Sequence, residues 1–177
     1  PMLRKLCVIA AAAALVAAPL PSLAQGKKDS VVMGMTLEPP GLDPTNAAAA
    51  AIAEVTLYNV YETLTKINED GSVSPLLAES WQASPDLKTY TFKLRKGIKF
   101  HNGEPFDSAA VKFSFDRAAA PTSTNKDKSL YQAFASVTAP DPETVVVALK
   151  YSEPNLPFLL GQATGSIVEP KSAPTDA

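Results

Sequence analysis

The chain has 177 residues, with 16 basic and 18 acidic side chains, a formal net charge of −2, one cysteine and one histidine. A single cysteine excludes an intrachain disulfide and a metal site built from several thiolates. The slightly acidic balance provides no basic patch of the kind that binds nucleic acid. The length is sufficient for one domain with its own core.

The first residues have the composition of a secretory signal sequence. Arg4 and Lys5 form a short basic region, and residues 6–18 are almost wholly apolar. Residues 22–24, Ser-Leu-Ala, place small side chains at the positions that a signal peptidase reads. The pattern predicts that the chain is exported.

A membrane anchor is the alternative interpretation of this segment. Spanning a bilayer needs about 20 apolar residues, and Pro19 ends the apolar run before that length. We therefore expect residues 1–24 to be a signal peptide that is cleaved after Ala24. Cleavage would remove Cys7 and leave residues 25–177 without cysteine, so that this part depends on its core for stability.

The region after the signal begins with a predicted strand, a loop and a helix. Residues 31–35 are nearly all apolar, which predicts a strand buried on both faces. Three prolines and a glycine in residues 38–44 predict a rigid loop. A helix capped by Thr45 or Asn46 is expected to run to about Leu64, because apolar residues recur at three- to four-residue steps.

Two turns and a hairpin are predicted next. Asp70-Gly71 and Pro85-Asp86 are turn signals, and residues 76–81 are expected to form a short turn or half-buried segment. Residues 90–95 alternate apolar and polar side chains, and residues 98–100 resume the same parity. We expect these two runs to form a hairpin with one apolar and one basic face.

A helix is predicted between Asp107 and Pro121. Asp107 is a suitable N-cap, and Phe106 and Val111 have the spacing of a hydrophobic staple. A polar surface loop over residues 121–129 is expected to follow.

The last predicted elements are a helical turn over 130–135, a strand over 145–149 and a short helix over 154–160 that a proline opens. This order of strands and helices predicts an α/β fold with a mixed sheet and flanking helices.

The residue types that carry catalysis are scarce. His101 has no second histidine or cysteine to join it, and the chain has no G-x-S-x-G nucleophile motif. The acidic pairs Glu69-Asp70 and Asp141/Glu143 flank turns, where solvated carboxylates are common. No catalytic residue, metal site or cofactor is therefore expected.

Three aromatic residues have both a packing and a binding interpretation. Trp81 is expected in the core, and a sugar-stacking platform is the alternative. Tyr58 and Tyr61 lie at helical spacing and are expected to pack, although both could point into a ligand cleft.

Two long motifs resemble a known family. They are residues 77–81 (Leu-Ala-Glu-Ser-Trp) and residues 90–106 (YTFKLRKGIKFHNGEPF), with residues 42–44 (Leu-Asp-Pro) upstream. Together they resemble the family 5 bacterial solute-binding proteins, which are the dipeptide-, oligopeptide- and nickel-type binding proteins of ABC transporters. The resemblance implies a periplasmic-binding-protein type II-like fold with two lobes that close on a solute. It further implies a monomer in the periplasm that delivers its solute to a permease in the inner membrane.

The resemblance also suggests how this chain relates to the whole receptor. Family members are much longer, so residues 25–177 are expected to be the N-terminal part of the first lobe. We expect this part alone to expose apolar core and to aggregate.

The resemblance assigns candidate ligand contacts to the loop after the first predicted strand. These are Thr36, Glu38, Pro39 and Leu42, with Glu38 placed to face a basic group of the ligand. The alternative is that the loop is only a proline-stiffened connector. Short peptides are the expected cargo. Other possible cargos are a nickel chelate, haem, glutathione or a sugar. A further alternative is that the protein is an exported hydrolase and not a carrier.

Overall fold

The computed structural model describes residues 30–46 and 50–173, and the chain divides into two units, Pro1–Gly34 and Met35–Ala177. The predicted signal peptide and its cleavage site lie outside the described residues. In the first unit, residues 30–34 form no helix or strand. All further elements belong to the second unit.

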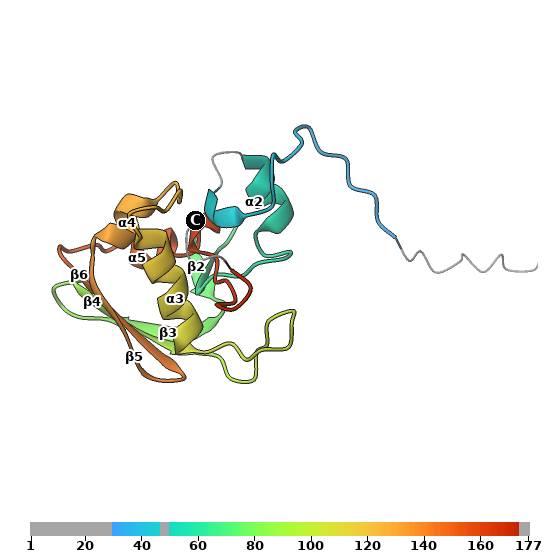
Figure 1. The fold of residues 1–177 in the computed structure, drawn as a ribbon. Helices are drawn as coiled ribbons and strands as arrows, with labels where there is room; N and C mark the ends of the chain where they lie inside the picture. The colour runs from blue at the N-terminus through green and yellow to red at the C-terminus, as the bar shows by residue number, and fades with distance from the viewer. Residues whose placement is uncertain (1–29, 47–49, 174–177) are drawn as a thin grey trace, which may run out of the picture. The chain divides into compact units, whose positions relative to one another are not determined.

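The described residues of the second unit form six strands, several short helices and one longer helix (Figure 1). The helical elements are η1 (Pro44–Asn46), α2 (Ala50–Thr56), α3 (Ser108–Ala119), α4 (Lys128–Gln132), α5 (Leu156–Leu159) and η2 (Ala163–Gly165). The strands are β1 (Thr65–Ile67), β2 (Val73–Pro75), β3 (Ala78–Ala83), β4 (Thr89–Leu94), β5 (Phe134–Asp141) and β6 (Thr144–Leu149).

The main sheet has the order β3-β4-β6-β5, and every neighbouring pair is antiparallel. The inner strands β4 and β6 place alternate side chains on the covered face. Phe92 lies opposite Val145, Tyr90 lies opposite Val147, and all four are at most 2% exposed. The predicted α/β class is therefore confirmed. The sheet was expected to be mixed, whereas every strand pair in the described residues is antiparallel.

Helix α3 covers one face of this sheet (Figure 1) and begins and ends where its local signals predict. The Asp107 carboxylate accepts a hydrogen bond from the Ala110 amide at 3.1 Å, which satisfies one of the free amides of the first turn. Phe106 and Val111 are both buried in the core, as the staple spacing predicts. Phe115 packs with Tyr131 and with Phe134, each at a centroid distance of 5.6 Å, and the rings of Tyr131 and Phe134 lie 5.5 Å apart.

The two predicted turns, at Asp70-Gly71 and Pro85-Asp86, and the strand predicted over 145–149 are confirmed. Asp70-Gly71 lies in the turn between β1 and β2, where Gly71 has a φ of +80°. Pro85-Asp86 lies in the turn between β3 and β4. The strand predicted over 145–149 is β6.

The strand predicted over Val31–Met35 is wrong. Val31, Val32 and Met33 are 77% to 96% exposed, and no neighbouring strand pairs with them among the described residues. An apolar run specifies burial only when a partner supplies the hydrogen bonds and the covering surface.

The long helix predicted up to Leu64 is also wrong at its end, because α2 stops at Thr56. Tyr58 has a φ of +61°, which ends the helical path of the backbone. The side-chain amide Nδ2 of Asn59 donates to the carbonyls of Glu54 and Val55 at 3.3 Å. The helical spacing of apolar side chains continues to Tyr61 in the sequence, although the backbone leaves the helix after Thr56. The predicted start of this helix lies partly at residues 47–49, outside the described residues.

The hairpin predicted between residues 90–95 and 98–100 does not form, because β4 pairs with β3 and β6 instead. Gly97 has a φ of +73° and turns the chain away, and Lys99 makes only an isolated bridge with Pro105. Alternation identified β4 correctly but carried no information about its partner.

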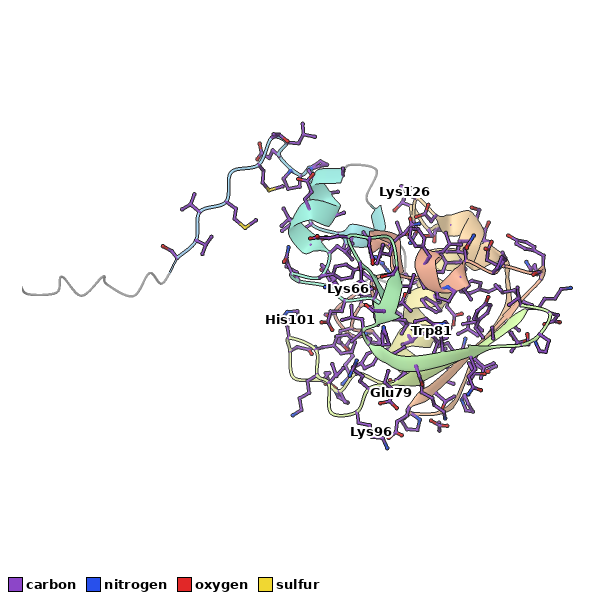
Figure 2. All side chains as sticks on the ribbon, turned by 180° about the vertical axis from the view of Figure 1, so that it is seen from behind. Lys66, Glu79, Trp81, Lys96, His101 and Lys126 are labelled. Carbon is purple, nitrogen blue, oxygen red and sulfur yellow. The ribbon has the colours of Figure 1, made fainter. Side chains whose placement is uncertain are left out.

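Other local predictions need smaller corrections. Residues 76–81 were expected to form a short turn or half-buried segment. Residues 78–83 form β3, in which Trp81 lies partly buried against the core (Figure 2). The loop over 121–129 is polar but not wholly at the surface, because Ser123 and Asn125 are buried. The turn expected at 130–135 is α4, which begins at Lys128. The last short helix is confirmed as α5, but it begins at Leu156 with Pro157 in its first turn, and Pro154, which was expected to open it, precedes the helix.

Candidate functional site

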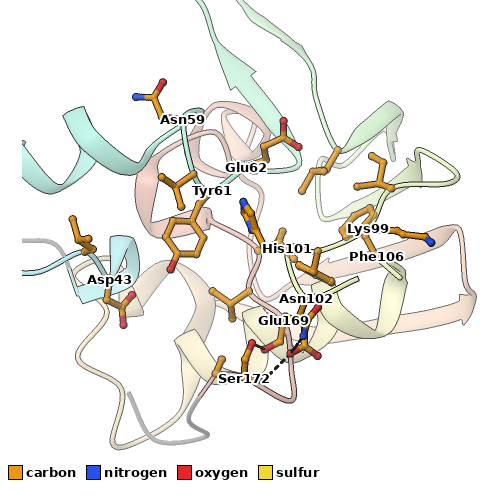
Figure 3. A pocket seen from close by; sticks show the side chains of 18 of the residues that line it. Asp43, Asn59, Tyr61, Glu62, Lys99, His101, Asn102, Phe106, Glu169 and Ser172 are labelled. Atoms are coloured by element: carbon orange, nitrogen blue, oxygen red, sulfur yellow. Dashed lines mark hydrogen bonds between the residues drawn. The ribbon is translucent and has the colours of Figure 1, made fainter. Parts of the chain in front are cut away.

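A cavity of about 720 Å³ opens beside the end of α3, within the second unit (Figure 3). Its walls come from four segments that are far apart in the sequence. They are Leu42-Asp43, Tyr58–Glu62, Ile98–Asn102 and Ile167–Glu169, with Leu77, Phe106, Arg117, Ser172 and Ala173 between them. We call this cavity the central pocket. Its volume lies within the range usual for small-molecule sites.

The wall at Tyr58–Glu62 depends on the turn that ends α2. The Tyr58 hydroxyl donates to the Gly161 carbonyl at 2.8 Å and accepts from the Ile67 amide at 3.0 Å. These bonds hold Tyr58 between two distant segments. Because they occupy its hydroxyl group, this group is not available to bind a ligand. Tyr61 keeps both roles, since its ring is half-buried and lines the pocket (Figure 3).

The wall at Ile98–Asn102 is a tight loop anchored by aromatic packing. The Phe100 amide donates to the Glu104 carbonyl at 2.8 Å, and the Gly103 amide donates back to the Phe100 carbonyl at 2.9 Å. Phe100 packs edge-on against Phe106 with centroids 6.1 Å apart. The loop therefore presents His101 and Asn102 to the pocket, with His101 exposed.

Glu169 organises the wall formed by Ile167–Glu169. Its carboxylate accepts hydrogen bonds from the Lys171 amide at 2.9 Å, the Ser172 amide at 2.8 Å and the Asn102 side chain at 3.0 Å (Figure 3). The bond from the Lys171 amide is the largest cause that holds the Glu169 pKa below its ordinary value, and the bonds from Ser172 and Asn102 add to it against the opposing effect of burial. The Glu169 side chain is thus a structural carboxylate whose charge faces the pocket.

Asp43 and Arg117 form the ion pair at the edge of the pocket. Arg117 Nη2 lies 3.4 Å from Asp43 Oδ2, and Arg117 Nη1 donates to Thr45 Oγ1 at 3.0 Å. The Thr45 amide and hydroxyl both donate to Asp43 Oδ1, at 2.9 and 2.7 Å. Burial alone would raise the Asp43 pKa, but the bonds from Thr45 and the charge of Arg117 outweigh it and hold the pKa below its ordinary value.

The structure brings one of the four predicted ligand contacts to the central pocket. Leu42 lines it and is 58% exposed. Thr36, Glu38 and Pro39 do not line it, and Thr36 and Glu38 are exposed on the segment that leads to it. Of the four residues, Leu42 alone lines the central pocket, and the proposed ligand contacts of Thr36, Glu38 and Pro39 stay predictions.

Most lining residues were not predicted. Asn102, Glu62 and Glu169 carry no spacing signal, because they come together only through the fold. His101 had been assigned to a loop, and it is a loop residue, but its position on the pocket wall was not foreseen. The predicted contact Leu42 and the possibility that Tyr58 and Tyr61 face a ligand were the sequence observations that pointed to this site.

The arrangement suits recognition by shape and hydrogen bonding. Apolar side chains such as Leu42, Val60 and Ile98 share the pocket with carboxylates and one imidazole. Within residues 30–46 and 50–173 no group of three histidine, cysteine, aspartate or glutamate side chains is placed to hold a metal ion. In the same ranges no helix has the length and apolar character to cross a membrane.

An α/β unit with a pocket of this size and with both polar and apolar walls is typical of small-molecule binding domains. Comparison with known proteins identifies the family: residues 72–177 match the model of the bacterial extracellular solute-binding proteins, family 5, and the chain belongs to this family.

Curated relatives are similar over most of the chain. The glutathione-binding protein GsiB of Shigella dysenteriae serotype 1 is 38% identical over 136 residues, which is 77% of this chain and 26% of that protein. GsiB of Escherichia coli (strain K12) is 39% identical over 109 residues, which is 62% of this chain and 21% of that protein. The chain thus spans about a quarter of the length of these relatives.

Solved structures give the same fold. The binding protein AgaA of A. tumefaciens R10, in complex with agropinic acid, has a TM-score of 0.71 and 31% identity over 76% of this chain and 27% of its own. NikA of Brucella suis, in complex with Fe(III)-EDTA, has a TM-score of 0.64 and 32% identity over 76% of this chain and 28% of its own. The expected periplasmic-binding-protein fold is therefore confirmed.

Proposed function

We propose that this chain is the N-terminal part of the first lobe of a periplasmic receptor that binds short peptides or similar small solutes and delivers them to an ABC permease. The observation that carries the proposal is the central pocket of about 720 Å³, built by four remote segments in a member of a solute-binding family. In this proposal residues 1–24 direct export and the receptor is a monomer. It acts as a carrier, without catalysis.

Glutathione and short peptides are the first cargos to test. The curated relatives are named for glutathione, itself a tripeptide, and one structural relative, OppA of Haemophilus influenzae, holds the peptide RPPGFSPFR. Both ligand types carry amine, amide and carboxylate groups that suit a pocket with polar and apolar walls.

The proposed contacts join two parts of this chain. Tyr61 and Leu42 would meet the solute within the central pocket, and Thr36, Glu38 and Pro39 would meet it from the segment that leads there. Glu38 is exposed and suits a basic group such as a peptide amine.

The test is native mass spectrometry of the exported product of the gene, followed by calorimetric titration with glutathione and with a dipeptide. We expect a chain that begins at Gln25, carries a releasable solute and binds one probe with a Kd of about 1 μM or below, roughly −8 kcal/mol. Leu42→Ala should weaken that binding about tenfold, while Lys126→Ala, on the polar loop labelled in Figure 2, should not.

Two outcomes would contradict the proposal. Hydrolysis of the offered peptides, seen as new amino termini by chromatography, would favour the exported hydrolase. Failure to bind any probe, with no co-purified solute, would remove the carrier role. If Glu38→Ala leaves every affinity unchanged, the leading segment is only a connector.

A further inference from the structure

Helix α3 carries two buried polar side chains one turn apart, Ser114 and Arg117, which are 7% and 6% exposed. Residues three apart lie on the same face of a helix. Buried polar groups of this kind are costly unless each makes its hydrogen bonds. Both side chains are bonded, and their partners lie on segments that line two different walls of the central pocket.

Arg117 holds the wall that precedes α2. Its two terminal nitrogens bond Thr45 Oγ1 and Asp43 Oδ2, at 3.0 and 3.4 Å, across more than 70 positions of sequence. Thr45 is 5% exposed, while Leu42 before it is 58% exposed. The guanidinium is therefore the side chain that fixes the point where the exposed leading segment meets the domain.

Ser114 holds the wall that follows η2. Its hydroxyl accepts from the Val168 amide at 3.0 Å and donates to the Ala110 carbonyl at 2.8 Å. Val168 and Glu169 both line the pocket. One face of one helix thus sets the positions of two pocket walls.

We propose that Ser114 and Arg117 are positioning residues of the solute site, which hold its two walls at the spacing that binding requires. This inference rests on the proposed function for the role of the pocket. The holding of the walls is a separate property, which can be measured without any ligand. A lysine at position 117 would keep the charge but would not span Thr45 and Asp43 with a planar fork.

The experiment compares the exported product with its variants Arg117→Met, Arg117→Lys and Ser114→Ala by amide hydrogen exchange, at times too short for global unfolding. We expect Arg117→Met to speed exchange in the peptide that covers residues 42–46 roughly tenfold, in line with the loss of a charge-assisted hydrogen bond. Arg117→Lys should give a smaller increase. Ser114→Ala should act on residues 167–173 instead, and strands β4 and β6 should stay protected in every variant.

Titration with glutathione and a dipeptide provides the second readout. Arg117→Met should raise the Kd of the bound probe about tenfold, with Arg117→Lys between it and the parent protein. Lys112→Gln is the matched control, because this residue lies on α3 outside the pocket and its ion pair among the described residues is with Asp116 on the surface. It should change neither exchange nor Kd.

Three results would overturn the inference. Unchanged exchange at residues 42–46 in Arg117→Met would mean that other contacts hold this wall. Equal acceleration in β4 and β6 would make Arg117 a general stability residue. Altered exchange with an unaltered Kd would show that the positions of these two walls do not affect solute binding. If the parent protein binds no probe, the proposed function fails, and exchange alone decides whether the two side chains hold the walls.

Discussion

Tyr58 combines an unfavourable backbone with a side chain that makes two bonds. Its φ of +61° lies in the left-handed region, which costs a residue with a Cβ about 1 kcal/mol or more. Its hydroxyl joins the Ile67 amide to the Gly161 carbonyl. The conformation persists because the side chain ties the end of α2 to β1 and to the segment after α5.

We predict that Tyr58→Phe lowers the free energy of unfolding by about 1–2 kcal/mol, since one amide and one carbonyl lose their partner. Tyr61→Phe is the matched control, because the Tyr61 hydroxyl makes no hydrogen bond within the part of the chain that the structure describes, and a change below about 0.5 kcal/mol is expected. Urea denaturation of both variants measures the difference. Equal losses would show that the Tyr58 hydroxyl has no special role.

The Glu169 carboxylate predicts a response to acid. Its folded pKa is below the ordinary value, so the charged form stabilises the fold above about pH 4. This contribution is lost as the pH falls through the lowered folded pKa. We expect Glu169→Gln to be less stable than the parent at pH 7, and the difference to shrink below pH 4.

Chemical denaturation between pH 2.5 and 7 tests this dependence. Glu54→Gln, at an exposed position of α2, serves as the control and should follow the parent curve. A Glu169→Gln difference that stays constant over the whole range would assign the effect to packing, with no part for the charge.

At the scale of elements, α3 is the helix that its local signals define most completely. We predict that Asp107→Ala destabilises the protein by about 1 kcal/mol, because the cap bond to the Ala110 amide is lost. Asp116→Ala removes an exposed carboxylate from the same helix and should cost less than about 0.5 kcal/mol. Thermal unfolding of the two variants would contradict this if their losses were equal.

The elements that the sequence predicted are those specified by their own residues. Helix α3 has its cap, its staple and a terminating proline, and β4 and β6 carry enough buried side chains to form a pattern. The edge strand β5 has Val137 as its one buried residue, so no alternation was visible. Strand β3 buries only Ala78 fully, and its neighbours face solvent.

The pocket was less predictable because no single segment contains it. Leu42 and Glu169 are separated by most of the domain, and only the fold places them on one cavity. Resemblance located the loop near the site, but Val31–Met35 had no partner in the described residues to make it a strand. Local patterns therefore predicted elements, while contacts between distant segments determined the site.

At the scale of the molecule, the second unit has a continuous core of its own. Phe92, Val111 and Val145 are fully buried between α3 and the sheet, and both inner strands are paired on each side. The sequence predicts exposed core and aggregation for this part of the chain, and that expectation stays a prediction. The described packing is the basis of a competing prediction, which is that residues 35–177 fold independently.

We predict that residues 35–177 melt in one cooperative transition, with an unfolding enthalpy of about 100 kcal/mol at the midpoint, as scales with this length. Differential scanning calorimetry would show agreement between the calorimetric and van't Hoff enthalpies. A broad transition, or aggregation before melting, would support the expectation drawn from the sequence.

The segment before α2 and the segment after α5 lie next to each other within the second unit, since η1 contacts η2. A contact between residues so far apart in the sequence closes a large loop, and the chain entropy lost in closing that loop slows folding.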